Sequence, residues 1–121
     1  MTAATRDFGV LEERVRRFRD EREWRRFHTP KDLAASVAIE AAELLEHFQW
    51  RTDEETRADL ADPAKRDAVA GEMADVLILL VSAADVLGID LFASALRKID
   101  ENALKYPVEK ARGRSTKYDK L

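Results

Sequence analysis

Two residue pairs that favour helix starts, Thr29-Pro30 and Asp62-Pro63, divide the chain into long segments. In each pair the first side chain can cap a helix, and proline suits the first helical position because its missing N–H needs no partner there. Apolar residues recur three and four positions apart in the segments between these pairs, as an amphipathic helix requires. With only 4 glycines and 3 prolines in 121 residues, little else interrupts a helix. The pattern therefore predicts an all-α chain.

We expect four main helices, at about residues 7–26, 30–50, 63–87 and 91–105, and a short helix starting within residues 51–62. Gly88 provides a stop for the third main helix, and Asp90 can cap the fourth. Apolar residues on several faces of the third helix predict that it is buried all round, and they suggest an oligomer interface. Residues 108–121 are basic and poorly periodic, and we expect them to form a tail.

Several classes of protein are excluded or disfavoured by simple counts. The chain has no cysteine, which excludes a disulfide framework, a thiolate metal site and a cysteine nucleophile. Its net charge of -3 disfavours a general binder of nucleic-acid polymers. The longest apolar run, residues 76–81, is far shorter than the ~20 residues that cross a bilayer, and residues 1–15 lack the apolar core of a secretory signal. We therefore expect a cytoplasmic protein with no membrane segment.

Two acidic doublets stand out on the second and third expected helices. Glu40 and Glu43 are three residues apart, as are Glu72 and Asp75, so each doublet shares one face of its helix. Adjacent like charges beside apolar neighbours destabilise a fold unless a cation binds them. Carboxylate oxygens suit hard cations, Mg²⁺ or Mn²⁺ first, and such a cation can bridge to phosphates and activate an attacking water. The doublets thus predict a metal site for phosphate chemistry.

Two other interpretations of the doublets remain open at this point. In a chain with 24 Asp and Glu residues, such pairs also arise as ordinary solvated positions on helix surfaces. A di-iron carboxylate site in a helix bundle is a second alternative, but it normally requires Glu-x-x-His pairs. The residue three after Glu43 is Glu46, and His47 follows one position later, which disfavours di-iron.

Aromatic residues bracket the second expected helix and offer surfaces for a nucleobase. Trp24 and His28 are four residues apart near the end of the first helix, so we expect them to share a face. Trp50 lies at the far end of the second helix. Flat aromatic rings can stack on a base, although tryptophans more commonly fill a core. The sequence contains neither a glycine-rich phosphate loop nor the Gly-x-Ser-x-Gly turn of a serine nucleophile.

The order and spacing of these motifs resemble the MazG-like, all-α NTP pyrophosphohydrolase superfamily, whose signature is Glu-x-x-Glu followed by Glu-x-x-Asp. Further segments are similar to its dCTP pyrophosphatase branch: residues 22–30, 46–50, 98–102 and 105–107. The resemblance extends over nearly the whole chain, from Phe18 to Tyr118. It implies a four-helix bundle completed by oligomerisation, in a homodimer or homotetramer, with the domain over residues 1–110 and a basic tail over residues 111–121.

The resemblance also implies a reaction and the residues that serve it. A nucleoside triphosphate and water would give the monophosphate and pyrophosphate, as in house-cleaning of the nucleotide pool. The implied metal ligands are Glu40, Glu43, Glu72 and Asp75, and one of these acids or Glu46 would orient or deprotonate the water. The implied nucleotide contacts are Trp24, His28, Trp50, Lys98 and Asn102.

One departure from the family pattern bears on substrate choice. In the dCTP-specific relatives a tyrosine follows the Glu-x-x-Asp motif by four residues, but here this position is Leu79. Loss of that hydroxyl can relax or change the preference for dCTP or modified dCTP. The alternatives are a pyrophosphohydrolase for many NTPs or for phosphoribosyl-ATP, and a non-catalytic helical oligomerisation or adaptor module. An adaptor has no reason to gather the four acids around one point.

Overall fold

The computed structural model describes residues 6–121, which form helices and short turns only. The elements are α1 (Phe8–Glu21), η1 (Arg25–Phe27), α2 (Pro30–Glu46), α3 (Asp53–Ala61), α4 (Pro63–Leu87), α5 (Leu91–Lys105), α6 (Val108–Ala111) and η2 (Tyr118–Lys120), where η marks a 3₁₀ turn. The all-α expectation is confirmed. The chain forms two compact units, one ending at Gly88 and the other covering Ile89–Leu121, and each is described by itself.

The expected cap residues begin the helices where the sequence placed them. The side chain of Thr29 accepts the Asp32 N–H at 3.2 Å at the start of α2. Asp62 accepts the Ala64 N–H at 3.1 Å at the start of α4. These side chains satisfy N–H groups that lack partners in the first helical turn. The predicted bounds 63–87 and 91–105 are confirmed for α4 and α5, with Gly88 in the left-handed region between them at φ 67°.

Two predicted helix ends are wrong. The first helix ends at Glu21 and not near residue 26, and the second ends at Glu46 and not at residue 50. After α1 the backbone turns through Glu23 at φ 54°. After α2 it tightens, because the N–H groups of His47 and Phe48 bind carbonyls only three residues back, and Trp50 then adopts φ 63°. Positive φ angles cannot continue a right-handed helix.

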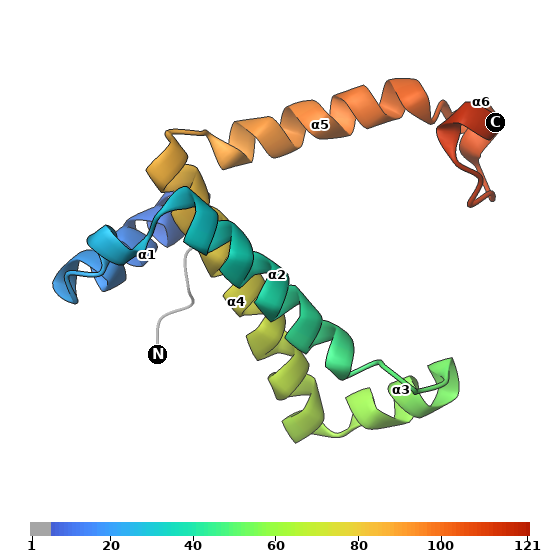
Figure 1. The fold of residues 1–121 in the computed structure, drawn as a ribbon. Coiled ribbons are helices and arrows are strands. Elements are labelled where there is room, and N and C mark those ends of the chain that lie inside the picture. The colour runs from blue at the N-terminus through green and yellow to red at the C-terminus, as the bar shows by residue number, and fades with distance from the viewer. Residues whose placement is uncertain (1–5) are drawn as a thin grey trace. The chain divides into compact units, whose positions relative to one another are not determined.

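In the first unit, α2 and α4 lie side by side and run in opposite directions (Figure 1). Helices α1 and α3 also pack against α4, so α4 is the central element. The buried apolar residues among those described are Leu33 of α2 with Val81 and Ala84 of α4. This contact between α2 and α4 brings the two acidic doublets onto neighbouring helices.

The expectation that the third helix is buried all round is not met within one chain. On α4, Met73, Leu77 and Ile78 remain exposed to solvent. The single chain has too few elements to cover every side of a 25-residue helix.

The second unit consists of α5 and the segment after it. Exposed apolar residues on α5 include Phe92, Leu96 and Ile99, three or four positions apart. The expected tail contains the one-turn helix α6. The ring of Tyr118 packs edge-on against Tyr106, with ring centroids 6.0 Å apart, so the tail folds back onto the end of α5.

Among residues 6–121, no single helix has both the length and the apolar character of a membrane span; α4 and α5 meet that criterion only when they are counted together.

Candidate active site

Three of the four predicted metal ligands meet between α2 and α4. Glu40 and Glu43 come from α2 and Glu72 from α4, and each offers a carboxylate oxygen within 4.8 Å of the others. The i, i+3 spacing places the first two on one face of α2, and the packing of α2 on α4 adds the third. All three side chains are half-buried. The structure therefore brings together residues that are 32 positions apart, Glu40 and Glu72.

The cluster lacks protein groups that would neutralise it. Oε2 of Glu40 and Oε2 of Glu72 are buried, and neither accepts a hydrogen bond from a described residue. Within residues 6–121, no ion pair includes Glu40, Glu43 or Glu72. Buried carboxylate oxygens without donors are costly, and a cation would satisfy them. The donor set, all oxygen and all anionic, suits a hard divalent cation.

The crowding of these carboxylates also changes the pKa of Glu40. Burial raises the pKa of Glu40 from 4.5 to about 7, and hydrogen bonding of its protonated form with Glu72 and Glu43 adds to the increase. The charges of Glu43 and Asp75 raise this pKa further. A carboxyl group that retains a proton near neutral pH lies among excess negative charge, which a metal ion can neutralise in place of that proton.

The other two predicted acids, Asp75 and Glu46, are outside this group of oxygens. Asp75 is exposed on α4, one turn beyond Glu72, and is near enough for its charge to raise the pKa of Glu40. It does not belong to the group of oxygens within 4.8 Å. Glu46 is exposed at the last residue of α2, one turn after Glu43.

The expectation that Trp24 and His28 share a helix face is wrong, because α1 ends before both of them. The Trp24 N–H donates to the Arg19 carbonyl at 3.0 Å, and the Trp24 ring packs edge-on against Phe18 at 5.7 Å between centroids. Nδ1 of half-buried His28 has no hydrogen-bond partner among the described residues. Burial lowers the pKa of His28, and the positive charge of Arg19 lowers it further, so a neutral imidazole is favoured.

Trp50 lies beyond the end of α2, and its side chain is 91% exposed. Lys98 and Asn102 are exposed on α5 in the second unit, one turn apart, and Lys98 Nζ is 3.4 Å from Glu101 Oε2. The roles of these three residues toward a nucleotide stay predictions.

A buried ion pair between α1 and α4 was not predicted from the sequence. The Arg19 side chain is 3% exposed; its Nη1 lies 2.6 Å from Asp85 Oδ2 and its Nε lies 2.8 Å from Asp20 Oδ1. Arg16 also reaches Asp85, at 3.4 Å. The pair joins α1 to α4, and the carbonyl of the same Arg19 accepts the Trp24 N–H. Arg19 and Asp85 are 66 positions apart, and no local pattern relates residues at that separation.

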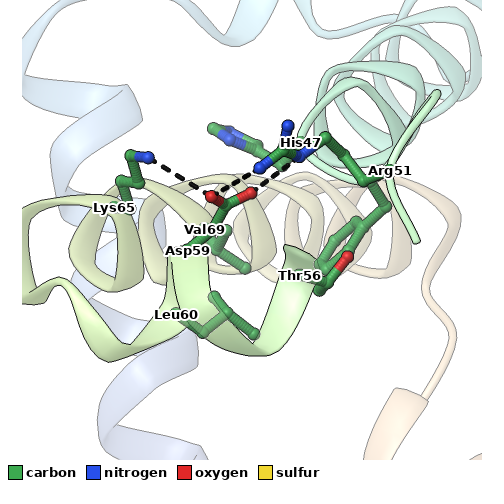
Figure 2. A pocket seen from close by; sticks show the side chains of 8 residues that line it. His47, Arg51, Thr56, Asp59, Leu60, Lys65 and Val69 are labelled. Carbon is green, nitrogen blue, oxygen red and sulfur yellow. Dashed lines mark hydrogen bonds and ion pairs between the residues drawn. The ribbon is translucent and has the colours of Figure 1, made fainter. Parts of the chain in front are cut away.

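A cavity of about 290 Å³ was also not predicted (Figure 2). It lies where the end of α2, α3 and the start of α4 meet, and its lining is His47, Phe48, Arg51, Thr56, Asp59, Leu60, Lys65 and Val69. The Arg51 guanidinium donates two hydrogen bonds to Asp59, at 2.9 and 2.8 Å, and Lys65 Nζ approaches Asp59 at 3.3 Å. Hydrogen bonding from Arg51 is the main cause that lowers the pKa of Asp59, and Lys65 contributes.

Comparison with known proteins identifies relatives over most of the chain. The model of the MazG-like family matches residues 35–121. The dCTP pyrophosphatase 1 proteins of Homo sapiens and Bos taurus are 41% and 40% identical to the chain over 104 residues, which is 86% of this chain. Those residues make up 61% and 62% of the relatives, so the chain spans about three fifths of their length.

A solved structure supports the same relationship over nearly all of its own length. The crystal structure of a pyrophosphatase from Archaeoglobus fulgidus DSM 4304 matches with a TM-score of 0.77 and 41% identity. The match covers 88% of this chain and 98% of that chain.

Proposed function

The chain belongs to the MazG-like family, and from this premise we propose that it is a nucleoside triphosphate pyrophosphohydrolase. The reaction is hydrolysis of a (d)NTP at the α-phosphorus: water adds its oxygen, the bond to the bridging oxygen breaks, and (d)NMP and pyrophosphate leave. The observation that carries the proposal is the cluster of Glu40, Glu43 and Glu72, with two buried carboxylate oxygens that have no protein donor. A helical adaptor would gain nothing from this arrangement.

The proposed cofactor is Mg²⁺, for which Mn²⁺ can substitute, held by Glu40, Glu43, Glu72 and Asp75. The three clustered carboxylates fit a hard cation because their oxygens are close together, and because buried oxygens of Glu40 and Glu72 have no hydrogen-bond partner among the described residues. When bound, such a cation neutralises phosphate charge and lowers the pKa of an attacking water. The exposed Asp75 and Glu46 are one helical turn beyond Glu72 and Glu43, and we propose that one of them accepts a proton from that water.

The proposed substrate is dCTP or a modified dCTP, because the relatives in Homo sapiens and Bos taurus are named dCTP pyrophosphatase 1. Trp24 and Trp50 offer exposed rings for the base, and neutral His28 can donate or accept one hydrogen bond with the nucleoside. Lys98 and Asn102 are proposed to contact phosphate and base. Leu79 provides no hydroxyl, which favours a broader choice of base or sugar.

We also propose that the active form is a homodimer or homotetramer, with the catalytic domain over residues 1–110, a basic tail over residues 111–121 and a cytoplasmic location. The support for self-association is exposed apolar surface: Met73, Leu77 and Ile78 on α4, and Leu96 and Ile99 on α5. A monomer rarely leaves this much large apolar surface in water, and a second copy would cover it.

The proposed function is tested by product analysis. The purified chain is incubated with Mg²⁺ and a panel of canonical and 5-modified dNTPs, and the products are separated by ion-exchange chromatography. We expect dNMP and pyrophosphate in equal amounts, with the highest rate on a cytosine nucleotide. Release of a single phosphate, or no turnover of any nucleotide with Mg²⁺ or Mn²⁺, would contradict the proposal.

A further inference from the structure

Trp50 has a backbone conformation that its own side chain does not favour. Within residues 6–121, Glu23 and Trp50 are the non-glycine residues with positive φ, and Trp50 has φ 63°. Bulky residues rarely adopt this left-handed region, and they keep it only where surrounding structure imposes it. The Trp50 side chain is 91% exposed, so packing of the ring cannot be what holds the backbone there.

The structure that imposes this conformation follows immediately in the chain. All three nitrogens of the Arg51 guanidinium have carboxylate partners: Nε and Nη2 bind the two oxygens of Asp59 at 2.9 and 2.8 Å, and Nη1 lies 3.0 Å from Glu55 Oε2. Two parallel bonds from a planar guanidinium fix its orientation as well as its distance. Figure 2 shows Arg51 and Lys65 converging on Asp59 from opposite sides of the cavity.

The same arginine is fixed at its backbone. The Arg51 N–H donates to the Phe48 carbonyl at 3.2 Å, which closes the turn around Trp50. Thr52 then caps α3, and its backbone N–H and hydroxyl exchange hydrogen bonds with Glu55 at 3.3 and 3.1 Å. The backbone of Trp50 therefore lies between the end of α2 and Arg51, whose N–H binds the Phe48 carbonyl and whose side chain binds Asp59 of α3.

We propose that Arg51 is a positioning residue: its clamp on Asp59 holds Trp50 as a preformed stacking surface for the nucleobase. This inference rests on the function proposed above. Arg51 is not assigned to the phosphates, because its three nitrogens are already engaged with carboxylates. If the Trp50 ring is ordered before the nucleotide binds, binding does not include the entropic cost of ordering that ring. The clamp should therefore affect nucleotide affinity more than the chemical step.

The first test measures the order of Trp50 without any nucleotide. In a Trp24→Phe background Trp50 is the one remaining tryptophan, since the chain has 2, and its fluorescence anisotropy reports local motion of the ring. Arg51→Met and Asp59→Asn should each lower that anisotropy. The matched control is Arg17→Met, which removes an arginine from an exposed ion pair with Glu13 on α1. Equal anisotropy in Arg51→Met and Arg17→Met would overturn the proposal.

The second test uses steady-state kinetics with dCTP and Mg²⁺ in the otherwise unchanged chain. Arg51→Met should raise KM by about 2- to 10-fold, the range expected for ordering one large side chain, with kcat changed by less than about twofold. Arg51→Lys keeps the charge but loses the paired bonds to Asp59, and it should fall between Arg51→Met and the parent. A fall in kcat with unchanged KM would overturn the proposal, because it would place Arg51 in the chemistry.

A double-mutant cycle separates positioning from general damage. If Arg51 acts through Trp50, then Arg51→Met should add less than about twofold to the KM of Trp50→Ala. Independent, multiplying effects on KM would overturn the proposal. Absence of all nucleotide hydrolysis by the parent chain would contradict the proposed function alone, and the anisotropy comparison would still decide whether the clamp orders Trp50.

Discussion

The raised pKa of Glu40 predicts that cation binding weakens steeply below neutral pH. The ligand is the deprotonated carboxylate, so proton and cation compete for it. With a pKa of about 7, the apparent Kd is multiplied by 1 + 10^(pKa − pH), a factor of about 11 at pH 6 and about 1.1 at pH 8. We therefore expect Mg²⁺ or Mn²⁺ to bind about tenfold more weakly at pH 6 than at pH 8.

Isothermal titration calorimetry with MnCl₂ at pH 6, 7 and 8, at constant ionic strength, measures this change. Glu40→Gln has no ionisable carboxyl group at this position, so it should bind the cation more weakly at both pH 6 and pH 8 and lose this part of the pH dependence. Glu13→Gln, a change in an exposed glutamate of α1, should behave as the parent. A parent Kd that stays constant within about twofold from pH 6 to pH 8 would refute the reasoning, because proton competition with a pKa of about 7 requires the tenfold change.

The same pKa sets the direction of a stability change without metal. Because the folded-state pKa lies above the unfolded value of 4.5, the folded chain holds more protons than the unfolded chain between about pH 4.5 and 7. Its free energy of unfolding must therefore fall as pH rises through that window, with the loss complete above pH 7. Thermal melts in EDTA should show this fall in the parent and a smaller one in Glu40→Gln. Addition of Mg²⁺ at pH 8 should raise the Tm of the parent.

Three further predictions follow from the described contacts. Glu43→Gln should reduce kcat/KM by at least about 100-fold, since loss of even an outer-shell partner of a metal costs ~10–100-fold, while circular dichroism keeps its helical signal; full activity would contradict the site. Asp85→Ala leaves the 3%-exposed Arg19 without its closest partner. We expect it to cost about 2–3 kcal/mol in urea unfolding, less than the ~3–5 kcal/mol of a fully buried pair, because Asp20 still binds Arg19; a loss below about 0.5 kcal/mol would contradict the importance of the pair. Trp50→Gly should be about 1 kcal/mol more stable than Trp50→Ala, since glycine adopts φ 63° without strain, and both should raise KM; equal stability would argue against backbone strain at this position.

Helix starts could be predicted from the sequence because their causes are local. A cap residue and the proline after it act within one turn, so Thr29 and Asp62 begin α2 and α4 at the expected residues. Two helix ends could not be predicted. Aromatic residues continue the apolar spacing past Glu21 and Glu46, and both stops lack the glycine that marks the end of α4. The stops are non-glycine turns, which other parts of the fold must hold in place.

The sequence by itself determined the helical class and the pairing of acids within each helix. The i, i+3 spacing alone places Glu40 beside Glu43, and the motif order carried the resemblance to the family. Only the tertiary structure decided that Glu72 of α4 joins them, that Arg19 is buried against Asp85 and that Arg51 clamps Asp59 beside Trp50. The physical reason is the range over which each influence acts. Helix geometry relates residues within a turn or two, whereas contacts between helices depend on how whole helix faces pack, and local residue spacing does not determine that packing.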